Sequence, residues 1–273
     1  MGAYFRPATL DAALAALAAQ RWTVLAGGTD HFPARGDRLP DEDILDIAGL
    51  PGQRAIVATP DHWLIQSGTT WSDVIATPLP PQFDGLKAAA SQVGGRQVQN
   101  TGTVVGNLCN ASPAADGTPC LLALEAEVEL ASAGGTRVLG VADFLTGRRA
   151  TARRPDELVA GLRIPRRDTA RSAFVKLGAR RYLVISIAMV AIIADIADGR
   201  IGTARVAVGA CGPMATRLPA AEAALEGHRP DPALITADML SPLAPIDDVR
   251  ATAAYRRVAA LELVRRAVAG LAA

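Results

Sequence analysis

The sequence predicts an α+β protein of two domains, divided near residue 168. Its 273 residues are enough for two domains, or for one domain with a sizeable appendage. Before residue 168, short strand and helix patterns alternate, whereas three longer strand patterns and a helical segment follow it. We therefore expect an N-terminal domain of residues 1–168, with subdomains of about 1–55 and 56–168, and a C-terminal domain of residues 169–273.

The first subdomain is predicted to be a small α/β unit. Thr9 has the residue type of a helix N-cap, and the apolar residues after it have helical spacing. The segment 22–26 is predicted to be a strand that stops at Gly27-Gly28, and 44–47 a second strand. The order helix, strand, glycine turn and strand is typical of an α/β unit.

The rest of the N-terminal domain is predicted to mix strands with helices. The expected elements are a strand at 62–66, a helix near Trp71, a helix between Phe83 and Val93, a hairpin of 128–131 and 136–139, and a strand at 158–164. A Pro-Arg-Arg-Asp linker follows at 165–168.

The C-terminal domain is predicted to be a three-stranded antiparallel sheet with helices. Strands are expected at 173–177, 185–196 and 201–208. A final helix would bury the face that carries Tyr255, Val258, Leu261, Val264 and Val268.

Composition excludes several classes of protein. The 28 Lys and Arg residues nearly cancel the 27 Asp and Glu residues, so no nucleic-acid partner is expected. The longest apolar run, 185–194, is shorter than the roughly 20 residues that cross a bilayer, so no membrane span is expected. Cys109, Cys120 and Cys211 form no metal-ligand spacing, which predicts packed thiols, no metal site and a cytoplasmic location.

Two glycine-containing segments, 25–30 and 101–107, follow apolar runs. Glycine lets backbone N–H groups approach a ligand closely, and converging N–H groups suit a diphosphate. Gly27-Gly28 alone also fits an ordinary turn after a strand. The chain has no G-x-G-x-x-G, which argues against a Rossmann dinucleotide site.

Several motifs in order carry a more specific resemblance. Ala26-Gly-Gly-Thr-Asp30, Thr101-Gly-Thr-Val-Val-Gly-Asn107 and Ala111-Ser-Pro-Ala-Ala-Asp116 resemble the flavin-binding signatures of the medium subunit of molybdenum hydroxylases. That family includes the xanthine dehydrogenase, aldehyde oxidase and carbon monoxide dehydrogenase flavoproteins. The resemblance covers nearly the whole chain. It implies a two-part FAD-binding domain of the vanillyl-alcohol-oxidase/PCMH type and a C-terminal domain of the CO dehydrogenase flavoprotein type.

The resemblance also implies the residues that contact FAD. Residues 25–32 would wrap the diphosphate, 103–107 would grip it from the other side, and Asp116 would accept hydrogen bonds from flavin hydroxyls. Lys176 and Ile185 would approach the flavin from the C-terminal domain. The full implied set is Leu25, Ala26, Gly27, Gly28, Thr29, Asp30, His31, Phe32, Val93, Thr103, Val104, Val105, Gly106, Asn107, Asp116, Val159, Lys176 and Ile185.

Two positions depart from the family pattern. Val105 stands where the family usually has a second glycine, and its Cβ would hinder one close approach to phosphate. His31 replaces a residue that is usually apolar, and either faces the flavin region or lies in an exposed loop.

Two other sets of residues have alternative interpretations. Cys109 and Cys120 flank the second glycine segment and suggest redox chemistry, but small buried thiols are the favoured interpretation, because neither cysteine has a basic activator nearby in the sequence. The arginine-rich region 148–171 would meet an acidic partner or a dinucleotide acceptor, or form a solvated face with a few ion pairs.

The function implied is electron transfer. The chain would hold FAD, take electrons from a [2Fe–2S] small subunit, and work beside a molybdopterin-containing large subunit in a heterotrimer that forms dimers. No catalytic acid–base pair is expected on this chain, and the acceptor stays open among NAD, oxygen, a quinone and a carrier protein. The alternatives are a stand-alone FAD-dependent reductase or oxidase of the same fold, and a scaffold subunit that has lost FAD.

Overall fold

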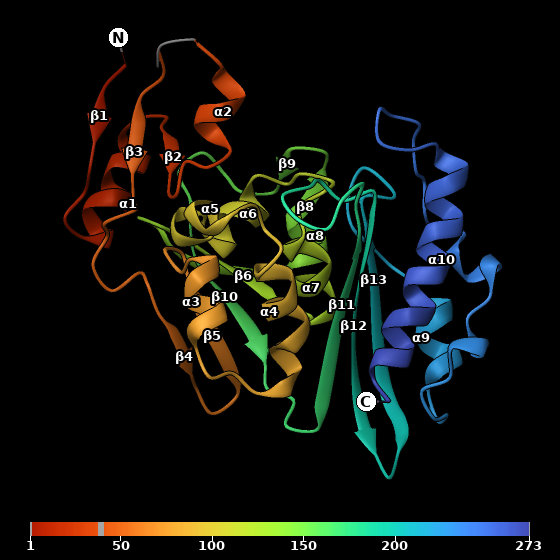
Figure 1. The fold of residues 1–273 in the computed structure, drawn as a ribbon. Helices are drawn as coiled ribbons and strands as arrows, with labels where there is room; N and C mark the ends of the chain where they lie inside the picture. Colours follow the sequence, from red (N-terminus) through yellow and green to blue (C-terminus); the bar gives the residue numbers. More distant parts are fainter. Residues whose placement is uncertain (1, 38–40, 273) are drawn as a thin grey trace.

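The computed structural model describes residues 2–37 and 41–272. In this part of the chain, a small N-terminal sheet, a five-stranded sheet and a C-terminal sheet follow one another across the molecule, with helices between and outside them (Figure 1). No helix of the described residues is long and apolar enough to cross a membrane.

The N-terminal unit is a parallel sheet with one packed helix. Strands β1 (Tyr4–Phe5), β3 (Ile44–Asp46) and β2 (Thr23–Leu25) lie in that order. Helix α1 (Leu10–Ala19) begins where predicted, because the Thr9 hydroxyl oxygen accepts a hydrogen bond from the Ala12 N–H at 3.2 Å. Apolar residues of α1 and β3 form a small core that Leu158 of the next sheet helps to close. A short helix, α2 (His31–Arg35), follows β2.

The central sheet is antiparallel, with the order β4-β5-β10-β6-β7. Its strands are β4 (Ile56–Ala58), β5 (His62–Gln66), β6 (Glu127–Ser132), β7 (Gly135–Gly140) and β10 (Leu158–Pro165). Strand β5, the β6–β7 hairpin and β10 agree with the predicted elements. The associated short elements are α3 (Trp71–Ala76), η1 (Pro81–Phe83), α4 (Asp84–Ala90), α5 (Arg96–Thr101), α6 (Val104–Cys109), α7 (Gly117–Ala123), α8 (Val141–Phe144), β8 (Leu145–Gly147) and β9 (Ala150–Thr151).

The C-terminal sheet has four strands rather than the predicted three. Strands β11 (Ala170–Leu177), β12 (Ala188–Ala197) and β13 (Arg200–Gly209) pair antiparallel, and the short β14 (Thr216–Arg217) adds to β13. Strand β12 begins at Ala188 and not at residue 185. The reason is a loop at 178–187, in which Ile185 is 53% exposed, so the apolar run in the sequence joins a loop to a strand.

Helices cover both faces of this C-terminal sheet. Helices α4 and α7 pack between it and the central sheet, and α9 (Pro219–Leu225) and α10 (Ala253–Gly270) cover its other face (Figure 1). The short helices η2 (Pro232–Leu234) and η3 (Ala237–Leu240) join α9 to the last helix. The larger core therefore contains residues of both the central and the C-terminal sheets.

The predicted buried face of α10 is wrong in part. Val264 and Val268 are fully buried, but Tyr255 is 51% and Val258 71% exposed. Arg256 takes the inward position instead, because its guanidinium donates to the carbonyl oxygens of Ile187 at 2.6 Å and Ala210 at 2.9 Å.

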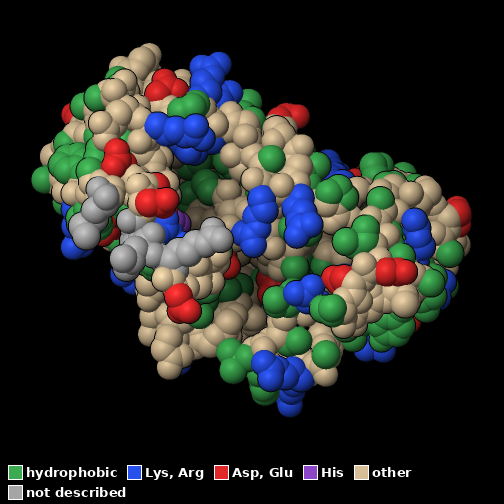
Figure 2. All heavy atoms as spheres, turned by 90° about the horizontal axis from the view of Figure 1, so that it is seen from above, with side chains coloured by type: hydrophobic (Ala, Val, Ile, Leu, Met, Phe, Trp, Pro, Cys, Tyr) green, Lys and Arg blue, Asp and Glu red, His purple; other side chains and the backbone are tan. Residues whose placement is uncertain are grey.

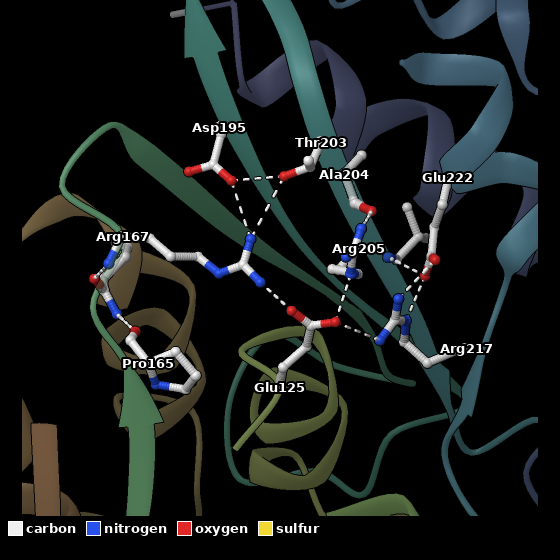
Figure 3. Close-up of polar contacts among 11 residues, drawn as sticks. Glu125, Pro165, Arg167, Asp195, Thr203, Ala204, Arg205, Arg217 and Glu222 are labelled. Carbon is white, nitrogen blue, oxygen red and sulfur yellow. Dashed lines mark hydrogen bonds and ion pairs between the residues drawn. The ribbon is translucent and has the colours of Figure 1, made fainter. Parts of the chain in front are cut away.

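A cluster of ion pairs joins the end of α7 to the C-terminal sheet (Figure 3). Glu125 accepts from Arg205 Nε at 2.6 Å, pairs closely with Arg167, and lies 3.7 Å from Arg217. Arg167 also donates to Asp195 at 3.0 Å. Burial alone would raise the pKa of Glu125, but these guanidinium groups outweigh that effect and lower the pKa.

Candidate functional site

A cleft of about 940 Å³ lies between the N-terminal unit, helices α5 and α6, and strand β11. Figure 2 views the molecule from the side on which it is hollowed, and Lys and Arg side chains gather around the hollow. The volume is near the upper end of the range of about 300–1,000 Å³ that holds small molecules and cofactors. The cleft is therefore large enough for a dinucleotide.

The first glycine segment lines this cleft with open backbone. Gly27 lies so close to the second segment that a Cβ on it would sit 2.1 Å from the Thr101 carbonyl oxygen. Gly28 has φ +66°, and a Cβ there would come within 2.8 Å of the Phe32 ring. The N–H groups of Gly27, Gly28 and Thr29 have no acceptor among the described residues. They are therefore available to an anionic ligand.

The second glycine segment forms the start of α6. The Thr103 hydroxyl oxygen accepts from the Gly106 N–H at 2.9 Å, and a Cβ on Gly106 would lie 2.7 Å from that oxygen. Val105 is only 4% exposed, and its side chain packs in the main core. The side chain that departs from the family pattern is thus taken into the protein interior.

Asn107 supplies an unsatisfied polar atom to the cleft. Its Oδ1 is buried and has no hydrogen-bond partner among the described residues. Because a buried acceptor without a partner is costly, this atom indicates a missing donor such as a ligand hydroxyl or amide. The donor set of this cleft, open N–H groups beside a buried acceptor, fits a polar cofactor with a diphosphate.

Asp116 and Lys176 form a buried ion pair across the cleft wall. Lys176 Nζ donates to Asp116 Oδ2 at 2.6 Å, and the Ser186 hydroxyl donates to Oδ1 at 2.6 Å. The two charged side chains are 7% and 6% exposed. Burial raises the pKa of the Asp116 carboxyl, while Lys176 and Ser186 oppose that rise. The carboxylate predicted to accept hydrogen bonds from the flavin thus also binds Lys176 of strand β11.

The cleft brings together the implied cofactor-contacting residues except two. Val93, Val159 and Ile185 line it from the α4–α5 connection, β10 and the 178–187 loop. Phe32 does not line the cleft, is 50% exposed and lies against Gly28. Val104 is fully buried and packs in the main core. Phe32 therefore contacts the first glycine segment and Val104 contacts the main core, and neither side chain lines the cleft.

His31 lies in the cleft wall and its side chain is 22% exposed, so it is not in an exposed loop; that it faces the flavin stays a prediction. Its Nε2 is 3.3 Å from Glu42 Oε1, and its ring meets Phe32 edge to face at 5.2 Å. Burial lowers the pKa of His31, and the nearby Arg35 lowers it further. The imidazole is therefore neutral at pH 7 and acts as a polar wall residue.

Several polar residues near the cleft, four of which matter for its chemistry, were not in the implied cofactor-contacting set. Asn110, Arg149 and Arg153 line it, and Ser186 holds Asp116. The arginine-rich region indicated that some arginines could meet a ligand, but nothing in the sequence distinguished Arg149 and Arg153 from their neighbours. Fold contacts distant in sequence decide which of them reach the cleft.

The three cysteines are free thiols, as predicted. Burial raises the pKa of Cys109 and of Cys211 to about 11 and that of Cys120 well above its usual value. The thiols are therefore protonated and poorly nucleophilic at pH 7. No group of three potential His, Cys, Asp or Glu metal ligands occurs among the described residues.

The fold and the cleft define an α+β protein with a cavity of cofactor size between two sheet units. Two family models match the chain: the FAD binding domain in molybdopterin dehydrogenase at residues 1–167, and the CO dehydrogenase flavoprotein C-terminal domain at 173–271. The chain belongs to the family of FAD-binding medium subunits of molybdenum hydroxylases, which are oxidoreductases. An FAD-binding domain is thus part of this chain.

Individual relatives agree with this assignment. The chain is 28% identical to the nicotine 6-hydroxylase medium subunit of Paenarthrobacter nicotinovorans, over 97% of this chain and 95% of that one. It is 31% identical to the xanthine dehydrogenase FAD-binding subunit of Escherichia coli O157:H7, over 80% and 77% of the two chains. A solved chain of carbon monoxide dehydrogenase from Hydrogenophaga pseudoflava superposes with a TM-score of 0.90 at 27% identity, covering 98% and 96%.

Proposed function

We propose that this chain is the electron-transfer flavoprotein subunit of a molybdenum hydroxylase, with FAD held in the cleft. The observation that carries the proposal is the meeting of both glycine segments with Asn107 and the Asp116–Lys176 pair around one cleft. Bound FAD supplies chemistry that accepts electrons singly and releases them in pairs. The chain itself supplies position and electrostatics.

Each wall of the cleft has a definite task in this proposal. The open N–H groups of residues 27–29 bind the diphosphate, and Asn107 Oδ1 accepts a hydrogen bond from the cofactor. Asp116 keeps acceptor capacity beyond its bonds to Lys176 and Ser186, so a cofactor hydroxyl can still donate to it. Val93, Val159 and Ile185 provide apolar contact.

The partners and acceptor complete the proposal. Electrons would come from a [2Fe–2S] small subunit, substrate oxidation would take place on a molybdopterin-containing large subunit, and two heterotrimers would form a dimer. An external acceptor would take the electrons. Support comes from relatives named as medium or FAD subunits. We place the complex in the cytoplasm, in keeping with the three free thiols.

We also propose the finer fold assignment. The N-terminal domain would be of the vanillyl-alcohol-oxidase/PCMH type, with a division from the C-terminal domain near residue 168 and between subdomains near residue 55. The separate small core around α1 supports the inner division.

Co-purification of the native complex tests the proposed function. The expected result is a visible flavin spectrum on this chain, with molybdenum and iron in the intact assembly. A colourless chain that cannot be reconstituted with FAD would favour a scaffold. Turnover of an organic substrate by the isolated chain would favour a stand-alone flavin enzyme, and absence of both metals from the assembly would refute the complex.

A further inference from the structure

The cleft wall contains two arginines whose positive charge has no carboxylate partner in the part of the chain that the structure describes. Among the described residues, the cations that line the cleft are Arg35, Arg149, Arg153 and Lys176. Lys176 is paired with Asp116, and Arg35 with Glu42. Arg149 and Arg153 donate only to uncharged oxygens of backbone or amide groups. Their charge is therefore left for a ligand.

Arg149 is held at the mouth of the cleft by a chain of hydrogen bonds to the first glycine segment. Its Nη1 donates to Asn110 Oδ1, and Asn110 Nδ2 donates to Asp30 Oδ2 at 2.7 Å. The Asp30 carboxylate thus orients the Asn110 amide, and this amide in turn orients the Arg149 guanidinium. This chain joins the β8–β9 turn, the end of α6 and the first glycine segment, three parts of the cleft that are distant in sequence.

The backbone at Arg149 is also specialised. Its φ of +58° lies in the left-handed region, and its N–H donates to the Ala111 carbonyl oxygen at 2.9 Å. A non-glycine residue is rarely kept in this conformation unless surrounding structure or function requires it. The turn therefore fixes the side chain toward the cleft at some conformational cost. Arg153 lines the same wall and donates to the Glu157 carbonyl oxygen at 2.6 Å.

We propose that Arg149, assisted by Arg153, binds the diphosphate of a dinucleotide in this cleft. The inference rests on the FAD-binding role proposed above and adds to it a cation that the glycine segments lack. A planar guanidinium held from one side still presents N–H donors to phosphate oxygens from the other. The diphosphate belongs either to FAD itself or to a dinucleotide acceptor such as NADH, and the two sources give different results in one experiment.

The experiment is a binding titration of the full-length chain stripped of flavin. FAD and riboflavin, which lacks phosphate, are titrated against wild type, Arg149→Ala, Arg149→Lys and the control Arg148→Ala. Arg148 lies in the same exposed turn but does not line the cleft. NADH is titrated against the FAD-loaded proteins. Melting temperatures are measured for every variant to establish that it is folded.

We expect Arg149→Ala to weaken FAD binding about tenfold, because a hydrogen bond to a charged, partly solvated group contributes at the lower end of its range. Riboflavin affinity and the Arg148→Ala control stay at the wild-type values, and Arg149→Lys restores part of the loss. Added salt weakens FAD binding by wild type more than by Arg149→Ala. If FAD binding is unchanged but NADH binding weakens about tenfold, the diphosphate is that of the acceptor.

Two results would overturn the inference. Equal weakening of FAD and riboflavin would mean that Arg149 only supports the fold of the cleft. Unchanged affinity for both dinucleotides would mean that its charge serves no diphosphate. Failure of the wild-type chain to bind FAD would instead refute the proposed function, so the two failures are distinguishable.

Discussion

Replacing Asp116 by asparagine removes the carboxylate from a buried ion pair while keeping the side-chain shape. Lys176 is 6% exposed and its other acceptor, the Gln92 carbonyl oxygen, is 3.4 Å away. Removal of one partner from a buried pair costs about 3–5 kcal/mol of unfolding free energy, because the other charge stays buried without compensation. The new amide can still form a hydrogen bond with Ser186, so we expect a loss of unfolding free energy at the lower end of this range, about 3 kcal/mol.

The reverse change, Lys176→Met, is expected to cost less. Burial already raises the pKa of Asp116, and loss of the ammonium group raises it further, which lowers the cost of leaving this carboxyl without a cation. We expect a cost of about 2 kcal/mol at pH 7. The double variant should lose less than the sum of the two single changes, with a coupling of about 2 kcal/mol.

Urea unfolding at pH 7 of the flavin-free chain, followed by both tryptophan fluorescence and circular dichroism, measures these free energies. The two signals must give the same transition for the values to be comparable. A coupling below about 0.5 kcal/mol would mean that Asp116 and Lys176 act independently. The conclusion that their ion pair stabilises the position of β11 would then be wrong.

Three further predictions concern other parts of the chain. Gly28→Ala should lower the melting temperature more than the control Gly36→Ala. Both glycines have a left-handed φ, but an added Cβ meets the Phe32 ring at Gly28 and open space at Gly36. Equal decreases in melting temperature would contradict the contact with Phe32. Glu125→Gln should cost about 1–2 kcal/mol at pH 7, since its side chain is one-third exposed. Folding lowers the pKa of Glu125, so the stabilisation by its carboxylate is present above about pH 4.5 and is lost as the pH falls through the pKa of the folded state. The unfolding free energy of the variant should therefore approach that of wild type in acid. A difference in unfolding free energy that does not change with pH would contradict this. Cys109 and Cys211 should resist a thiol reagent at pH 8 until the chain unfolds, since the pKa of each is about 11, and rapid labelling of native protein would refute this.

Local signals in the sequence predicted most of the elements near the site. Thr9 caps α1, the run before Gly27 forms β2, and the hairpin around Gly134 and Gly135 forms as expected. These succeeded because caps, turns and alternating apolar residues act over a few positions. The start of β12 failed because an apolar run continues from the exposed loop residue Ile185 into the strand.

The inward face of α10 shows a different limit. Apolar periodicity favours Tyr255 and Val258 as core residues, yet both are exposed. Arg256 is buried because backbone carbonyl oxygens from two other segments and Asp248 converge on its guanidinium. Periodicity contains no information about acceptors supplied by distant parts of the chain.

The sequence by itself determined the family, the α+β character and the two glycine segments, since each is a matter of ordered local motifs. Only the tertiary structure decided what surrounds them: that Asp116 is bonded to Lys176 and Ser186, and that Arg149 reaches the cleft. Lys176 is 60 positions from Asp116, and Asn110, which links Asp30 to Arg149, is 80 positions from the first and 39 from the second. Hydrogen bonds and ion pairs form between neighbours in space, and only the packed fold makes these residues neighbours.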